Sequence, residues 1–222
     1  MMRFLRTLCS SSAFSSRLSF SCAVIAVSGI LSLGRAAAEP VPLPTTDFEA
    51  TATTLGGATM IMHHSGDKAR VEMDVGITIT GIMDLKTRKM FMIGAIPGMS
   101  NMAVEVGIGD ASYGQVYGNG KRVGEDTVAG EPCQLWQMDS AKAGHDNKYT
   151  DGPVIVCLSQ DHIPLRTQAT IDGKLKTVTE ITQLKRVKQD PSLFVMPKDV
   201  KVMKMPKGVG ESIAAGALGL GK

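Results

Sequence analysis

The chain has 222 residues with 24 basic and 21 acidic side chains, a formal net charge of +3. Four of the basic residues lie within the first 38 positions, which hold no acidic residue: Arg3, Arg6, Arg17 and Arg35. The remaining 184 residues therefore carry 20 basic groups against 21 acidic ones, a net charge of −1. This balance excludes the strongly basic surface that nucleic-acid binding requires, and the length predicts one domain.

The first 38 residues show the order of features that is typical of an export signal. An apolar run of 13 residues at positions 21–33 follows the first three arginines, and small side chains occupy residues 36–38. This run is shorter than the roughly 20 residues that a membrane-spanning helix needs. We therefore predict cleavage after Ala38 and a periplasmic protein with no transmembrane segment. An organelle transit peptide lacks such an apolar block, and a lipid anchor at Cys22 would need the apolar run before the cysteine.

Two cysteines, Cys133 and Cys157, remain after the predicted cleavage. Each lies in a strand-like segment, and an oxidising compartment favours a disulfide between them. On the chain-entropy model, closing a loop of about 25 residues contributes about 3.5 kcal/mol to stability. A reactive or metal-binding thiol is the alternative, but the sequence places no base and no further ligands beside either cysteine.

Alternating apolar and polar residues predict antiparallel strands with one buried face. The clearest run spans residues 69–75, where Ala69, Val71, Met73 and Val75 alternate with charged side chains. One face of this strand must be buried while the other meets water. Similar runs predict further strands at residues 48–53, 58–64, 76–85, 87–93, 122–128, 133–138, 154–159, 165–171 and 174–188.

Other local signals predict turns and a few short helices. Three pairs of residues mark turns: Gly56-Gly57, Asn119-Gly120 and Asp172-Gly173. Residues 99–113 break the alternation, and Met99, Met102 and Val106 would share one face of a helix there. Asp190 before Pro191 predicts one helical turn.

These signals together predict a mostly β domain at residues 39–205. It should contain about nine or ten antiparallel strands in one curved sheet, with at most two helices. The Gly/Ala-rich residues 206–222 should form a flexible tail.

No catalytic motif and no cofactor motif is present in the sequence, so we expect a protein that is not an enzyme and holds no cofactor. His63 and His64 are neighbours on a predicted strand, so they point to opposite faces and cannot hold one metal together. Asp161 and His162 are neighbours in a predicted turn. An acid–base role for this pair is the weaker interpretation, because such neighbours are common in turns.

Methionine is unusually frequent, with 14 residues in the chain. Three interpretations remain open. The side chains fill an ordinary core, they line an adaptable cavity for apolar ligands, or they bind Cu(I) through thioether sulfur. The copper interpretation uses Met60, Met62 and His64, which alternate on one strand face. Successive residues on such a face are about 6–7 Å apart, so the three cannot converge on one ion without a bulge or ligands from elsewhere.

Three segments resemble exported bacterial proteins of unknown function that are related to the periplasmic lipoprotein carriers (the LolA/LolB-like fold). They are the G-E-P-C-x-x-W segment at residues 130–136, C-L-x-x-D-x-I-P-L at residues 157–165, and D-P-x-L-F-x-x-P at residues 190–197. The resemblance covers roughly residues 47–200. It implies a half-open antiparallel barrel whose apolar concave face is covered by helices and shelters acyl chains.

From the apolar face and this resemblance we expect a monomeric carrier for a lipid, an acyl chain or an acylated polypeptide. The residues expected to line its cavity are Val71, Met73, Val75, Met90, Met92, Met99 and Met102. Copper binding and a protein-interaction or sensor domain are the alternatives.

Overall fold

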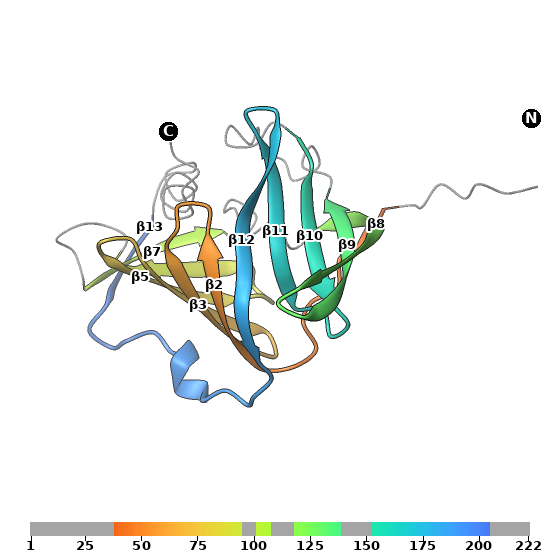
Figure 1. Ribbon diagram of the computed structural model, residues 1–222. Coiled ribbons are helices and arrows are strands. Elements are labelled where there is room, and N and C mark those ends of the chain that lie inside the picture. Colours follow the sequence, from red (N-terminus) through yellow and green to blue (C-terminus); the bar gives the residue numbers. More distant parts are fainter. Residues whose placement is uncertain (1–37, 95–100, 108–117, 139–151, 205–222) are drawn as a thin grey trace, which may run out of the picture. The chain divides into compact units, whose positions relative to one another are not determined.

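The computed structural model describes residues 38–94, 101–107, 118–138 and 152–204. In these segments thirteen strands form one sheet, in the order β1-β8-β9-β10-β11-β12-β2-β3-β4-β5-β6-β7-β13. Figure 1 shows β12 between β11 and β2, which joins the two halves of the chain edge to edge. The sheet is therefore continuous from the first described strand to the last.

The first half of the chain supplies the strands that follow one another as a meander. These are β1 (Glu39–Pro40), β2 (Phe48–Thr54), β3 (Thr59–Ser65), β4 (Lys68–Asp74), β5 (Thr78–Asp84), β6 (Lys89–Ile93) and β7 (Met102–Gly107). From β2 to β7 each strand pairs antiparallel with the next. Short β1 instead crosses to pair with β8, at the other end of the sheet.

The second half supplies another antiparallel run and a final strand on the far edge. The run comprises β8 (Asn119–Val128), β9 (Glu131–Met138), β10 (Val154–Ser159), β11 (Pro164–Ile171) and β12 (Lys174–Lys185). After β12 the chain forms the 3-10 turn η3 (Pro191–Phe194) and then β13 (Lys201–Lys204), which pairs parallel with β7. Arg70 of β4 donates a hydrogen bond to the carbonyl of Leu193 (3.0 Å), which holds η3 to the sheet.

The prediction of helices over a half-open barrel is wrong. The sheet does not close into a barrel, and the described residues form no α-helix. Residues 102–107, predicted as part of a helix, form strand β7. Their pairing with β6 and β13 stabilises a strand, and this long-range pairing outweighs the local helical spacing of Met102 and Val106.

The turn predictions are partly confirmed. Asp172 and Gly173 link β11 to β12 with positive φ angles of 53° and 70°, the conformation that a two-residue hairpin turn requires. Asp190 accepts a hydrogen bond from the amide of Ser192 (2.9 Å) and caps η3 as predicted. The predicted turn at Asn119 and Gly120 is wrong, because both residues lie in β8 and pair with β1.

The predicted alternation of β4 is confirmed. Ala69, Val71 and Met73 are buried, whereas Arg70 and Glu72 on the opposite face are half-buried and form an ion pair. Most of the buried hydrophobic side chains of the long strands belong to one cluster, which does not include Ile82 of β5 or Ala103 of β7. The face that carries Ala69, Val71 and Met73, called the inner face below, holds most of this cluster.

Candidate functional site

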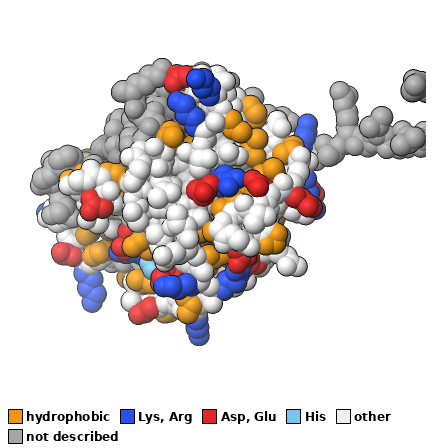
Figure 2. Space-filling model, in the orientation of Figure 1, with side chains coloured by type: hydrophobic (Ala, Val, Ile, Leu, Met, Phe, Trp, Pro, Cys, Tyr) orange, Lys and Arg blue, Asp and Glu red, His pale blue; other side chains and the backbone are white. Residues whose placement is uncertain are grey.

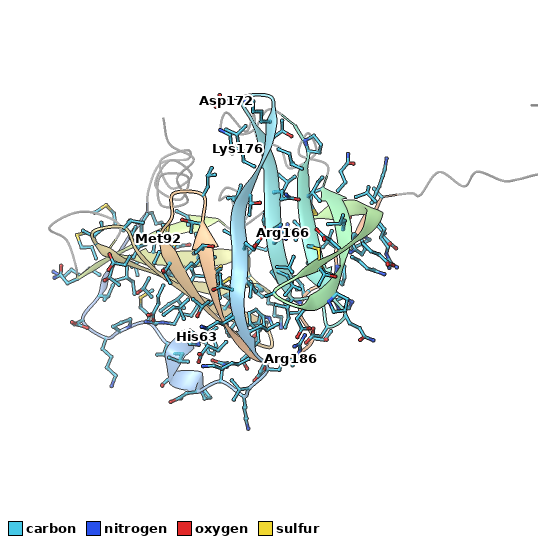
Figure 3. All side chains as sticks on the ribbon, viewed as in Figure 1. His63, Met92, Arg166, Asp172, Lys176 and Arg186 are labelled. Atoms are coloured by element: carbon cyan, nitrogen blue, oxygen red, sulfur yellow. A yellow bond between two sulfur atoms is a disulfide. The ribbon has the colours of Figure 1, made fainter. Side chains whose placement is uncertain are left out.

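Six methionines gather on the inner face of four neighbouring strands, β3 to β6. The strand register places them in cross-strand rows, with Met60 opposite Met73, and Met83 opposite Met90. We call this group the methionine face: Met60, Met62, Met73, Met83, Met90 and Met92. Figure 3 labels Met92, which lies opposite Gly81 of β5 on one side and Val104 of β7 on the other. The methionine face is thus a contiguous patch of flexible, polarizable side chains.

Gly81 leaves a notch in the middle of the methionine face. It lies between Val71 and Met92 in the register and has no side chain of its own. A Cβ atom placed on Gly81 would lie 3.5 Å from the sulfur of Met90, so the thioether of Met90 occupies the space above the glycine. The sulfur of Met90 is therefore the nearest atom to this position, and the carbonyl oxygen of Val71 lies 3.9 Å from it.

The structure brings four of the seven predicted lining residues together. Val71, Met73, Met90 and Met92 are buried within the core cluster, on the inner face of β4 and β6. Their role in ligand binding stays a prediction.

Of the other three predicted lining residues the structure describes two, and Met102 lies on the same face of β7 as Val104. Met102 is half-buried at the start of β7. Val75 lies just beyond the end of β4 and is 42% exposed, so the inner face of the sheet does not include it. Met99 falls outside the described residues.

His64 is the one charged or ionisable residue on the methionine-bearing face of β3, and it is only 2% exposed. Its ring stacks on Phe48 with the centroids 5.3 Å apart, and its Nδ1 lies 3.3 Å from the carbonyl oxygen of Thr46. Its Nε2 is buried and has no hydrogen-bond partner. Burial lowers the pKa of His64, although the contact with Thr46 opposes this shift. The imidazole is therefore neutral at pH 7.

The structure separates two members of the predicted copper site. Met60 and His64 are four residues apart on β3, about 13 Å along an extended strand. Met62 lies between them on the same face and is half-buried. Among the described residues, no group of three or more His, Cys, Asp or Glu side chains is placed to hold a metal ion. Any metal site here would have to include thioether sulfur.

A pocket of about 580 Å³ lies between the β8–β9 hairpin and the β10–β11 turn. Its walls combine carboxylates and amides with a few apolar groups: Glu125, Asp126, Thr127, Pro132, Cys133, Gln134, Leu158, Ser159, Gln160 and His162. The Nδ1 of His162 is buried without a hydrogen-bond partner, and its backbone is left-handed at φ 66°. No sequence pattern indicated this pocket, because its walls come from β8, β9 and the end of β10, which only the folded sheet brings together.

Asp161, one of the two neighbours considered for an acid–base role, has other partners in the structure. Asp161 accepts hydrogen bonds from Ser159 (2.6 Å) and from Arg186 (2.8 Å). Arg186 lowers the pKa of Asp161 to about 2, and it also donates two 3.0 Å hydrogen bonds to Glu131. Figure 3 shows Arg186 at the end of β12, where it links that strand to the turn. Asp161 is therefore a structural anion that fixes the turn.

The predicted disulfide is confirmed between Cys133 of β9 and Cys157 of β10, with Cα atoms 5.4 Å apart.

Arg166 of β11 lies directly opposite Cys157 and donates hydrogen bonds to Glu180 and Asp126. Figure 3 shows Arg166 on the face of the sheet that is turned toward the viewer. Figure 2, in the same orientation, shows a basic side chain between two acidic ones on this face. Hydrogen bonds from Thr127 and then Arg166 lower the pKa of Asp126, so this group is a carboxylate at neutral pH.

No family model and no curated protein matches the chain. Solved structures match at low identity. An uncharacterized conserved protein from Thermus thermophilus is 15% identical with a TM-score of 0.49, and the match covers 72% of this chain and 91% of that protein.

MucB is 14% identical with a TM-score of 0.46, over 70% of this chain and 59% of MucB. The Pseudomonas aeruginosa MucA/MucB complex gives a TM-score of 0.45 at 14% identity, over 73% of this chain and 59% of that one. With all TM-scores below 0.5, these likenesses assign the chain to no family. Within the described residues, no helix has the length and apolar character to cross a membrane.

Proposed function

We propose that the protein is an exported, non-enzymatic binding protein that takes up an apolar chain on its methionine face. The observation that carries this proposal is the notch at Gly81, where the nearest atom is the thioether sulfur of Met90. A methionine side chain has three rotatable bonds, so it can leave such a notch and admit a ligand of similar width. An ordinary core would place a fixed, branched side chain there.

The surroundings of the notch suit a hydrocarbon chain. Val71 and Met92 flank Gly81 across the register, and Val104 continues the same row onto β7. No charged side chain of the described residues lies in this row of the inner face. Burying methylene groups contributes about 0.8 kcal/mol each, so an apolar chain needs no charged anchor to bind here.

Substitution of Gly81 tests the proposal directly. Gly81→Val fills the notch with a β-branched side chain that suits a strand. The matched control is Thr80→Val, the neighbouring position of β5, which faces the other side of the sheet. Each protein is titrated with a fluorescent fatty-acid probe, and the bound probe is then displaced with unlabelled fatty acids of increasing length.

We expect saturable binding by the wild type that tightens roughly tenfold for every two added methylene groups, as their burial predicts. Gly81→Val should weaken binding about tenfold or more, and Thr80→Val should leave it unchanged. Circular dichroism and thermal melts establish that both variants fold. Absence of saturable binding by the wild type, or equal effects of the two substitutions, would contradict the proposal.

A further inference from the structure

We propose that His64, Met62 and Met83 form a binding site for a single soft monovalent cation, Cu(I), at one end of the methionine face. The proposal does not depend on an apolar ligand at Gly81. It rests on the buried Nε2 of His64, which has no hydrogen-bond partner, and on the thioethers that the register places beside it.

The hydrogen bond of His64 decides which ring nitrogen is free. The carbonyl oxygen of Thr46 can only accept a hydrogen bond, so the Nδ1 of His64 must carry the proton in their 3.3 Å contact. The neutral ring then has its lone pair on Nε2, which is the buried, unpartnered atom. Metal-binding histidines are commonly oriented in this way, with one ring N–H held by a backbone carbonyl.

The strand register places two methionines near His64 on the inner face. Met62 is two residues before His64 on the same face of β3, about 6–7 Å along the strand. Met83 lies in the same cross-strand row as His64, with only the small side chain of Ala69 between them. The backbones of β3 and β5 are about 10 Å apart, a gap that a methionine and an imidazole side chain together are long enough to span. The three donors come from two strands. Three ligands in a row on β3 would be too far apart to converge on one ion, and this arrangement avoids that obstacle.

The donor set selects the metal. Thioether sulfur and imidazole nitrogen are uncharged ligands that suit Cu(I) better than hard cations such as Mg²⁺ or Ca²⁺. One nearby anion balances the charge of a bound cation: the carboxylate of Asp47 acts electrostatically on His64 and accepts a hydrogen bond from Ser65 (2.9 Å). Cys133 and Cys157 are bonded to each other and offer no competing thiolate.

The experiment measures Cu(I) binding by the purified protein without oxygen, in competition with a coloured Cu(I) chelator. Any free thiol is first blocked with iodoacetamide. The variants are His64→Phe, Met62→Leu and Met83→Leu, which preserve most of the side-chain volume. Two matched controls are Met60→Leu, on the same face but about 13 Å from His64, and His63→Phe, on the opposite face.

We expect one Cu(I) per chain, no measurable binding by His64→Phe, and affinities about tenfold or more lower for Met62→Leu and Met83→Leu. The two controls should bind as the wild type does. A second measurement needs no substitution: Ag(I), a diamagnetic substitute for Cu(I), should shift the ¹⁵N resonance of His64 Nε2 and leave Nδ1 protonated. The proposal is overturned if the wild type takes up no Cu(I), if Ag(I) leaves Nε2 unshifted, or if Met60→Leu loses as much affinity as Met83→Leu.

Discussion

Arg166 of β11 donates a hydrogen bond of 2.6 Å to the carboxylate of Asp126 on β8, three strands away in the sheet. The two strands between them, β9 and β10, carry Cys133 and Cys157 on the same face as Arg166. Both cysteines are buried although this is not the inner face of the sheet. The guanidinium group, held also by Glu180, therefore covers the Cys157 end of the disulfide, while Cys133 lines the pocket.

Removing this cover should make the disulfide easier to reduce. Arg166→Ala leaves Cys157 open on the side of β11, so reduction by dithiothreitol should become several-fold faster at neutral pH, because access controls the attack of a thiolate. Thiol release is followed with a chromogenic reagent. Lys185→Ala is the control, since Lys185 forms an exposed pair with Glu49 far from the cysteines. Equal reduction rates for the wild type and Arg166→Ala would show that the guanidinium shields nothing.

The disulfide itself should contribute substantially to stability. The double variant Cys133→Ala/Cys157→Ala frees a loop of about 25 residues in the unfolded chain and should lose about 2–4 kcal/mol of the free energy of unfolding. Urea denaturation of the wild type and the double variant measures this loss, provided that the free energy of unfolding depends equally steeply on urea concentration in both proteins. A loss below about 1 kcal/mol would mean that residual structure in the unfolded chain already constrains this loop.

Two glycines with positive φ should respond differently to alanine. At Gly94 (φ +76°), a Cβ would lie 2.3 Å from the carbonyl oxygen of Thr78, so Gly94→Ala adds a backbone clash to conformational strain. At Gly76 (φ +88°) nothing lies within 4 Å. We expect Gly94→Ala to cost about 3 kcal/mol or more and Gly76→Ala about 1–2 kcal/mol, measured by thermal or urea denaturation. Equal losses would contradict the close approach of Gly94 to β5.

Much of the sheet is predictable from the sequence, because an antiparallel strand with one wet face alternates visibly along the chain. Residues 68–74 illustrate this, and so does the turn at Asp172 and Gly173, where both residues adopt the left-handed backbone that the pair favours. The disulfide is predictable because only two cysteines follow the predicted signal. These features depend on local chemistry.

The features that sequence alone missed depend on long-range pairing. β13 has four residues and is a strand only because β7 lies beside it, far earlier in the chain. β7 itself has helical spacing of Met102 and Val106, and only its pairing partners decide its conformation. The free Nε2 of His64 follows from a contact with Thr46 across 18 residues, which no pattern on β3 reveals.

The ion pair of Asp161 and Arg186 should make stability depend on pH in the acid range. Arg186 holds the pKa of Asp161 at about 2, below the usual 3.8. The contribution is therefore fully present above about pH 4 and is lost as the pH falls toward about 2. Because both side chains are partly exposed, we expect it to be about 1 kcal/mol.

Asp161→Asn isolates this effect. The difference in free energy of unfolding between wild type and variant, from urea denaturation, should be constant from about pH 7 to pH 4 and shrink to near zero at about pH 2. Glu49→Gln, which removes an exposed pair with Lys185, should show a difference below about 0.5 kcal/mol throughout. If the difference in free energy of unfolding between wild type and Asp161→Asn persists at about pH 2, the substitution acts through packing and not through charge.

The most direct test of an apolar ligand on the methionine face is to identify what the protein carries when it is purified from the cell. Native mass spectrometry of wild type and Gly81→Val, each prepared without detergent, followed by extraction in organic solvent, measures this. We predict that the wild type carries a lipid or fatty acid that the extraction releases, and that Gly81→Val carries far less of it. A wild-type protein found consistently empty, and still empty after incubation with lipid vesicles, would contradict the account.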